Sequence, residues 1–234
     1  MLWEIFSGSG TLPEKILQFL VLALVIIISL TVHEYSHGFV AYKLGDYTAK
    51  ADGRLSLNPL HHLDPVGTIM LLVIGFGYAK PVPVNTRNFR KPRRDLALVS
   101  IAGPLSNFVL AFIGALLFCV MIAFAPAEFL DGNFGYALLM LFNYSIAVNI
   151  GLGLFNLIPI PPLDGSNVLM CMLPGQVAAK FARLRYYTQY IWLAIIVISW
   201  LPGNAYYYLF YPLTWLRGVI FDGFVGFWAM IFGV

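Results

Sequence analysis

The chain has 234 residues, of which 60% are hydrophobic and 11% are charged, whereas a soluble domain carries roughly 25% charged residues. This composition excludes an ordinary soluble domain and indicates a membrane protein. The net charge of +3 has little meaning as a total, and the positions of the charges carry the information. Cys119 and Cys171 lie far apart without a CxxC pattern, so no disulfide framework is expected.

Several apolar stretches reach the length of about 20 residues that a membrane-spanning helix requires. The expected spans are residues 14–43, 96–125 and 135–158, followed by one that begins near Tyr190 and is interrupted at Pro202-Gly203. The first has neither a basic region before it nor a cleavage pattern after it, so we expect a retained span and not a signal peptide. Residues 205–234 contain Arg217 and Asp222, and they fit either one more span or an interfacial segment.

The sequence therefore predicts an all-α polytopic membrane protein with about four to six transmembrane helices, folded as one domain over residues 1–234. Residues 66–79 are apolar but too short to cross a bilayer, and we expect a re-entrant or β-hairpin segment near residues 66–90. Within it, Pro81 and Pro83 have no N–H, while Val82 and Val84 keep theirs on one edge. That edge could accept an extended peptide by strand addition. The sequence is equally consistent with a plain proline-rich turn that has no binding role.

Lysine and arginine residues are concentrated in two of the loops that join the expected spans. Nine lie in the region that joins the first and second spans, counted from Lys43 at the end of the first, three follow the third span, and none lies in the link that carries Glu128 and Asp131. Because cytoplasmic loops carry an excess of Lys and Arg, we expect both basic loops in the cytoplasm, the N-terminus outside and a bacterial-type plasma membrane. A nucleic-acid patch at Arg87–Arg94 is disfavoured, because this cluster adjoins a span.

The end of the first span carries His33-Glu34-Tyr35-Ser36-His37, an HExxH pattern inside an apolar helix. Residues four apart share a helix face, so both imidazoles can face one metal ion, and Glu34 can reach a metal-bound water as a general base. If the span enters the hydrocarbon near Leu17, His33 lies about 24 Å into a core of about 30 Å, near the cytoplasmic face. The alternative is a chance pattern of buried, hydrogen-bonded histidines.

A catalytic zinc site needs three protein ligands and one open position, so a third ligand must come from elsewhere. The best candidate is Asp164, which follows three prolines that break the end of the third span at a depth matching the histidines. Unwound backbone at that depth is tolerated only against protein or a water-filled cavity. Asp64 is the rival ligand. A second metal site at His61, His62 and Asp64 is disfavoured, because their order is not a helical ligand spacing.

Together these motifs resemble the site-2 protease family of intramembrane zinc metalloproteases, over most of residues 14–170. The resemblance rests on HEYSH, on NPLHHLDP at 58–65, on GYAKPVPVN at 77–85, on AGPLSN at 102–107 and on NLIPIPPLDG at 156–165. It implies a compact member with a catalytic core at about 14–170 and C-terminal helices at about 186–234, without a PDZ insertion or a nucleotide-sensing domain.

The resemblance implies one Zn²⁺ per chain and assigns roles to five residues. The ligands are His33, His37 and Asp164, the general base is Glu34, and the residue that helps hold the scissile carbonyl or its oxyanion is Asn156. Two further asparagines, Asn107 and Asn149, are expected to make structural hydrogen bonds between helices. The aromatic residues at 206–215 are expected to form an interfacial belt.

The expected activity is hydrolysis of peptide bonds within or near transmembrane segments of other membrane proteins. The partners would be a transmembrane protein substrate and membrane lipid, with no nucleic acid, and the oligomeric state stays open. The main alternative is a zinc-binding transporter or channel, because intramembrane His and Asp also mark ion pathways. A second alternative is an inactive homologue that binds membrane helices without cutting them.

Overall fold

The computed structural model describes residues 5, 8, 10–74, 79–200 and 205–234, and the structural statements below concern these residues. Their regular elements are helices, with no β-strand in the part of the chain so described. The long helices are α2 (Leu12–Lys43), α5 (Pro92–Phe124), α7 (Asn133–Asn156) and α11 (Ala205–Phe232). The shorter α-helices are α3 (Thr48–Ala51), α4 (Pro65–Ile74), α6 (Ala127–Leu130), α8 (Asp164–Met172), α9 (Gly175–Ala182) and α10 (Thr188–Trp200). Three 3₁₀ turns complete the order: η1 (Pro59–His61), η2 (Thr86–Asn88) and η3 (Arg183–Tyr187).

Four helical segments are long and apolar enough to cross a membrane, judged by length and composition. They are α2, α5, α7 and residues Phe210–Phe232 of α11, so the first three expected spans are confirmed as candidates. The described part of the stretch from Tyr190 belongs to α10, which has 13 residues, and residues 201–204, where the predicted interruption falls, lie outside the described range, so this span stays a prediction. The fourth candidate lies within 205–234, the segment that the sequence left open.

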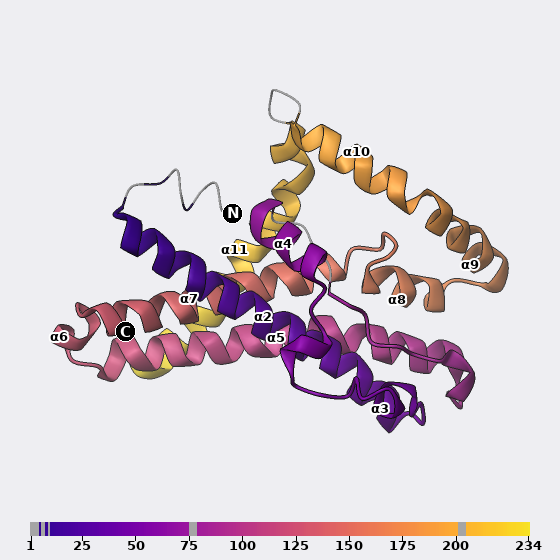
Figure 1. Ribbon diagram of the computed structural model, residues 1–234, viewed down its shortest axis with the longest axis horizontal. Helices are drawn as coiled ribbons and strands as arrows, with labels where there is room; N and C mark the ends of the chain where they lie inside the picture. Colours follow the sequence, from indigo (N-terminus) through magenta and orange to yellow (C-terminus); the bar gives the residue numbers. More distant parts are fainter. Residues whose placement is uncertain (1–4, 6–7, 9, 75–78, 201–204) are drawn as a thin grey trace.

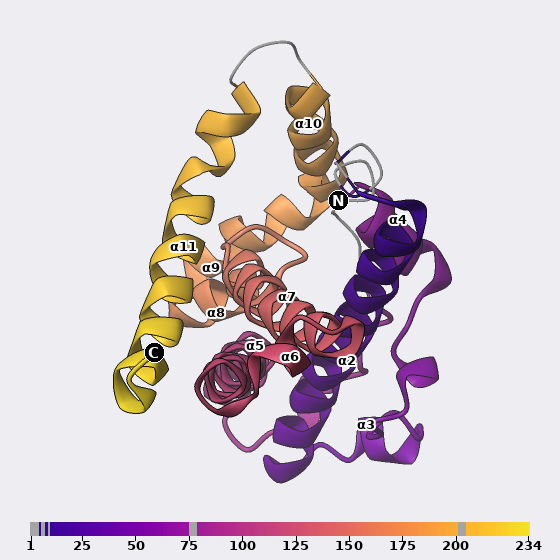
Figure 2. The same ribbon diagram turned by 90° about the vertical axis from the view of Figure 1, so that its left-hand side faces the viewer.

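Helix α5 lies at the centre of the arrangement and packs against α7, α2, α8 and α11. Figures 1 and 2 show α2, α5 and α7 side by side, with α11 along the outer side of α5 and α7. The core between α5 and α7 places Ala111 and Ala115 against Ile146 and Ile150, all fully buried. The small alanine side chains allow the two helices to approach closely, and this close approach fixes how α5 presents its side chains to α2.

The predicted β-hairpin is not present in the described part of residues 66–90. Helix α4 is described as far as Ile74, residues 75–78 lie outside the described range, and residues 79–85 form an extended segment that is not paired as a strand. Pro81 and Pro83 supply no N–H for a strand ladder, which explains an extended but unpaired segment. The re-entrant position in a membrane stays a prediction.

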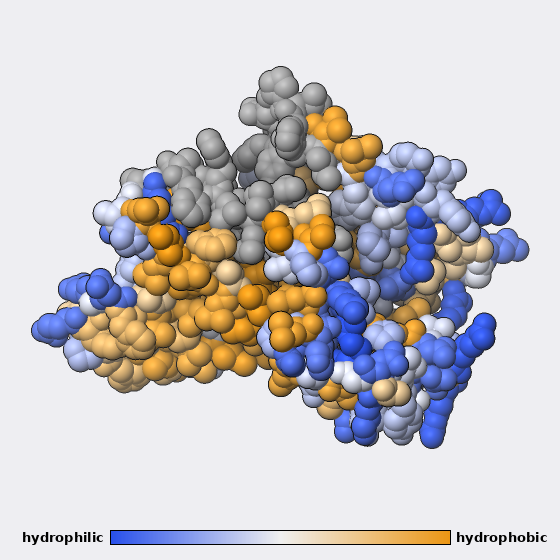
Figure 3. All heavy atoms as spheres, viewed as in Figure 1, coloured by the Kyte–Doolittle hydropathy of each residue, from blue (hydrophilic) through white to orange (hydrophobic). Residues whose placement is uncertain are grey.

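The surface of the molecule has an apolar band between two polar ends. Figure 3 shows the apolar band over the middle of the long helices and the largest polar area at the end that holds α3 and the start of α5. Exposed apolar side chains repeat every four residues along two helices, at Leu20, Leu24 and Ile28 of α2 and at Leu105, Val109 and Ile113 of α5. Such continuous apolar faces are typical of contact with lipid or with another protein.

Candidate metal centre

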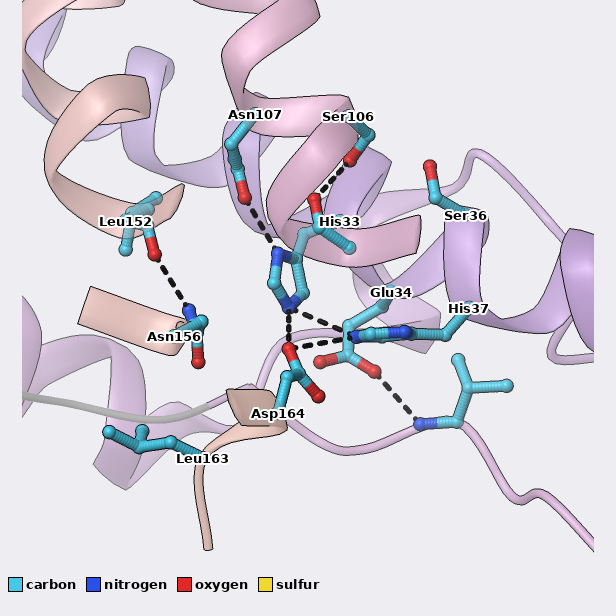
Figure 4. A network of polar contacts seen from close by, with 12 residues as sticks. His33, Glu34, Ser36, His37, Ser106, Asn107, Leu152, Asn156, Leu163 and Asp164 are labelled. Carbon is cyan, nitrogen blue, oxygen red and sulfur yellow. Dashed lines mark hydrogen bonds and ion pairs between the residues drawn. The ribbon is translucent and has the colours of Figure 1, made fainter. Parts of the chain in front are cut away.

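Three side chains from two distant parts of the chain converge at the predicted site. His33 and His37 lie on consecutive turns of α2, and Asp164 is the first residue of α8. The two histidine Nε2 atoms are 3.1 Å apart, and Asp164 Oδ2 lies 3.2 Å from Nε2 of His33 and 3.3 Å from Nε2 of His37. Figure 4 shows this triangle of ligand atoms. It is the one group of three potential metal ligands found among the described residues.

A tight turn after α7 brings Asp164 to the histidines. Helix α7 ends at Asn156, and the proline-rich residues 157–163 form a loop that returns to the end of α7 before α8 begins. The backbone of Gly165 lies so close to the Leu157 carbonyl that any Cβ would collide with it. Trp192 of α10 donates its indole N–H to the Pro161 carbonyl over 3.1 Å. The turn is therefore held from both sides, and glycine is required next to the ligand.

Hydrogen bonds to the other ring nitrogens fix which nitrogen of each histidine faces the site. His37 Nδ1 lies 2.7 Å from the Val99 carbonyl oxygen, which can only accept, so Nδ1 carries the proton. His33 Nδ1 donates to Oδ1 of Asn107 over 2.6 Å. Both Nε2 atoms therefore present lone pairs toward Asp164.

The three ligand atoms fit a tetrahedral zinc ion. Metal–ligand bonds of about 2.0–2.1 Å give a tetrahedron with edges of about 3.3–3.4 Å, close to the separations of 3.1–3.3 Å observed here. Asp164 Oδ2 is buried and receives no hydrogen bond within the described structure. Lone pairs this close repel one another unless a cation lies between them. The set also leaves one position of the tetrahedron open, as a catalytic zinc requires.

Helix α5 is pressed against the histidine pair at Gly103. A Cβ added at this position would lie 2.6 Å from Cε1 of His33 and closer still to Nε2 of His37. Only glycine permits this approach. The close approach also brings Val99 and Asn107, one turn before and one turn after Gly103, to the two imidazoles.

Asn107 has a role that the sequence did not assign to it. Its side chain is fully buried, accepts from His33 and donates to Oδ1 of Asn149 over 2.8 Å. Asn149 in turn donates to the Ser145 carbonyl over 2.9 Å. The predicted structural hydrogen bonds between helices are present, and they also orient a ligand histidine. An outer partner of this kind fixes the orientation of a metal ligand and raises its basicity. The sequence signals were an amide inside an apolar helix and its place at the end of the AGPLSN motif.

Glu34 and Asn156 lie beside the triangle in Figure 4. Glu34 is 8% exposed, and its Oε2 accepts a 2.9 Å hydrogen bond from the Val82 N–H. The side-chain N–H of Asn156 donates to the Leu152 carbonyl over 3.0 Å, and Figure 4 marks no contact at its Oδ1. Val84 packs on the cluster of Ala41, Phe89 and Val99.

The rival acidic and histidine residues do not join the metal site. Asp64 caps α4 by accepting from the Gly67 N–H over 2.9 Å. His61 contacts the Gly53 carbonyl and His62 the Ser56 carbonyl, at 3.1 and 2.6 Å. Within the described ranges they form no ligand group with Asp64, so the structural interpretation fits best.

Comparison with known proteins identifies the family. The model of "Peptidase family M50" matches residues 21–137 and 132–199. The chain is 48% identical over 185 residues to "Putative zinc metalloprotease YwhC" of Bacillus subtilis, covering 79% of this chain and 83% of that protein. It is 30% identical over 182 residues to "Putative zinc metalloprotease Rip2" of Mycolicibacterium smegmatis, covering 76% of this chain and 65% of the relative.

A third relative is archaeal: "Zinc metalloprotease MJ0392" of Methanocaldococcus jannaschii is 32% identical over 155 residues, covering 65% of this chain and 34% of that protein. No solved structure matches the chain. The family match, the long apolar helices and the ligand triangle agree on an integral membrane protein that uses zinc. The chain belongs to peptidase family M50 and is a zinc metalloprotease.

Proposed function

We propose that this metalloprotease cuts peptide bonds within or near transmembrane segments of other membrane proteins. The observation that carries the proposal is the position of the ligand triangle, which lies between helices that are themselves long and apolar enough to cross a membrane. Two ligands belong to α2, and the partners of their Nδ1 atoms belong to α5.

Each residue of the site can have a separate role in the hydrolysis. His33, His37 and Asp164 would hold the zinc, which when bound lowers the pKa of a water and polarises a carbonyl. The Glu34 carboxylate, beside the triangle and buried with it, takes the proton of the attacking water and passes it to the leaving amine. Asn156 would hold the scissile carbonyl or its oxyanion with its side-chain amide, after releasing the Leu152 carbonyl.

The substrate segment must unwind before it is cut, because a helix uses its carbonyl groups in internal hydrogen bonds. The proposed strand addition at Val82 and Val84 would hold such an unwound segment. In this structure the Val82 N–H already donates to Glu34, so pairing at that residue would require the bond to be released. Cleavage of substrate by Val84→Pro, compared with wild type, tests the strand-addition prediction, and unchanged cleavage would end it.

We also propose that the active site opens near the cytoplasmic face. The metal ligands of α2 lie in its C-terminal part, and α2 ends at Lys43, next to α3 and the basic residues that precede α5. In Figure 3 the largest polar area covers this same end. The orientation that follows from the positive-inside rule places the N-terminus outside.

Glu34→Gln tests the proposed function against a transporter. The protein and its variant are co-expressed with a panel of single-span membrane proteins, and cleavage, bound zinc and zinc flux are measured. We expect the variant to lose cleavage by at least about a hundredfold, because it lacks the general base, and to keep its zinc. The matched control is Glu128→Gln, an exposed residue between α5 and α7, which should cleave normally. A variant that still cleaves at the wild-type rate would refute the role of Glu34, and zinc flux that survives in the variant would favour transport.

A further inference from the structure

An extended segment crosses the site next to Glu34 and is fastened to the protein at three points. We call this segment, residues 79–85, the strap. Its central contact is the hydrogen bond from the Val82 N–H to Glu34 Oε2, which joins residues 48 positions apart in the sequence. Both residues are 8% exposed, so water competes little for this bond. Figure 4 shows it beside the three ligand side chains.

We propose that the Val82 N–H positions the Glu34 carboxylate for proton transfer, and that Asp46 and Arg54 are positioning residues that hold the strap in place. This inference rests on the proposed peptidase function, because it assigns Glu34 the role of general base. It differs from strand addition, in which the Val82 N–H would bind the substrate and not the base.

Arg54 fastens the first end of the strap. Its guanidinium donates through Nη2 to the Lys80 carbonyl over 2.7 Å and to the Pro81 carbonyl over 3.3 Å. The Lys80 N–H donates to the His62 carbonyl over 2.8 Å. One arginine therefore holds the two carbonyl groups that immediately precede Val82, and a planar guanidinium is suited to such paired acceptors.

Asp46 fastens the other end from the turn that follows α2. This carboxylate is fully buried, and its Oδ2 accepts from the Asn85 N–H over 2.7 Å. Its Oδ1 accepts from the side-chain amide of Asn88, also over 2.7 Å, and from the N–H and hydroxyl of Thr48. Four donors on one buried carboxylate make a rigid anchor, because each bond to a charged acceptor is stronger than a neutral one.

Between its two anchors the strap lies against the same face of α2 that carries Glu34. A Cβ added at Gly38, one turn after Glu34, would lie 3.1 Å from Cγ1 of Val82. The absence of a side chain at Gly38 therefore lets Val82 approach the helix. Pro81 and Pro83 fix φ on either side of Val82, and a residue that precedes proline favours extended backbone. The two prolines and the contact with Gly38 therefore fix the backbone of Val82 with its N–H directed at Glu34.

The chemical consequence concerns the orientation of the base. With Oε2 occupied by the Val82 N–H, the carboxylate is held in one rotamer and Oε1 is left for the proton of the attacking water. Loss of a hydrogen bond to a charged group is expected to lower kcat about 10- to 100-fold. KM should change little, because the bond does not involve the substrate.

The sharpest test removes the Val82 N–H and keeps its side chain, while the Pro81 carbonyl becomes a weaker ester acceptor for Arg54. Replacing Val82 by its α-hydroxy acid exchanges the amide N–H for an ester oxygen and keeps the side chain. The matched control is the same exchange at Val66, in the first turn of α4, where a helix does not use the N–H. Zinc-loaded full-length proteins are compared on a single-span substrate that the wild type cleaves, and kcat, KM and bound zinc are measured.

The outcomes separate this inference from the proposed function. A fall of kcat in the Val82 ester, with KM and zinc unchanged and the Val66 ester like wild type, supports it. An unchanged kcat in the Val82 ester overturns it while leaving the peptidase function intact, and so does a rise in KM alone, which would favour strand addition. If the wild type cleaves no member of the panel, the proposed function fails first and this inference fails with it.

A second pair of variants decides the question if the ester protein does not fold. Asp46→Asn places an amide N–H₂ among donors and releases the end of the strap, whereas Asp52→Asn makes the same change at an exposed residue of the same loop. We expect kcat to fall in Asp46→Asn with zinc retained, and Arg54→Lys to show a smaller fall because one donor remains. Wild-type kcat in Asp46→Asn would overturn the inference.

Discussion

Asn107 links the architecture of α5 to the metal site. Its buried amide accepts from His33 and donates to Asn149. We expect Asn107→Ala to weaken zinc binding about 10- to 100-fold, the usual effect of removing an outer partner of a ligand histidine. Competition with a chelator of known affinity measures this change directly.

Two companion variants test whether the effect of Asn107 on zinc is specific. Asn107→Asp keeps an acceptor for His33 Nδ1 and should recover most of the affinity. Asn143→Ala removes an exposed amide from α7 and should bind zinc like the wild type. Equal zinc affinity in Asn107→Ala and the wild type would show that the hydrogen bond does not support the site.

Gly103 is a residue at which the packing against both imidazoles leaves no room for a Cβ. Gly103→Ala would bring a Cβ to 2.6 Å from Cε1 of His33, and relieving that overlap is expected to destabilise the protein by about 1–3 kcal/mol and to displace the ligands. Bound zinc and the thermal midpoint in detergent both report the change. Gly226→Ala in α11, with nothing within 4 Å of the added Cβ, should be neutral or slightly stabilising. If both variants behave alike, the packing argument is wrong.

At the scale of elements, Asp46 joins the turn after α2 to the strap and to η2. Burial alone would raise the pKa of this carboxyl, but hydrogen bonds from Thr48, Asn88 and Asn85 lower it below its ordinary value. A group with a lowered pKa in the folded state stabilises the protein fully above the unfolded pKa of about 3.9, and this contribution is lost as the pH falls through the folded pKa.

We therefore expect the stability difference between wild type and Asp46→Asn to be largest near neutral pH and to shrink as the pH falls below about 4. Thermal midpoints of both proteins in detergent between pH 7 and pH 3 measure it. The exposed Asp52→Asn control should show no such trend. A difference that stays constant over this range would mean that the Asp46 carboxylate does not titrate with folding.

The elements also show which parts of the fold the sequence patterns predicted and which they did not. Apolar length located α2, α5 and α7, because each must satisfy its own backbone hydrogen bonds along a membrane-length run. It did not decide the C-terminal region, where residues Phe210–Phe232 of α11 form the fourth candidate span. The hairpin expected near residues 66–90 is not formed in the described residues, because strand pairing depends on a partner that an apolar pattern does not specify.

At the scale of the whole molecule, the apolar band and the two unequal polar ends make orientation testable. Single cysteines are placed at Arg90 and Glu128 in a background of Cys119→Ser and Cys171→Ser. An impermeant maleimide added to intact cells should label Glu128→Cys and should reach Arg90→Cys only after the membrane is opened, because basic loops are retained inside. The reverse labelling pattern would invert the proposed topology and move the active site to the outer face.

The sequence by itself predicted the metal ligands and the general base. HExxH is a local pattern, because helix geometry alone places His33 and His37 on one face. The helix break before Asp164 is predicted by the prolines that precede it in the sequence. The tertiary structure decided the surroundings of the site: Asn107 on His33, Gly103 against both imidazoles, and Val82 on Glu34. These contacts join residues 48 to 74 positions apart, and they depend on how α5 and the strap pack against α2, which no periodicity within one segment encodes.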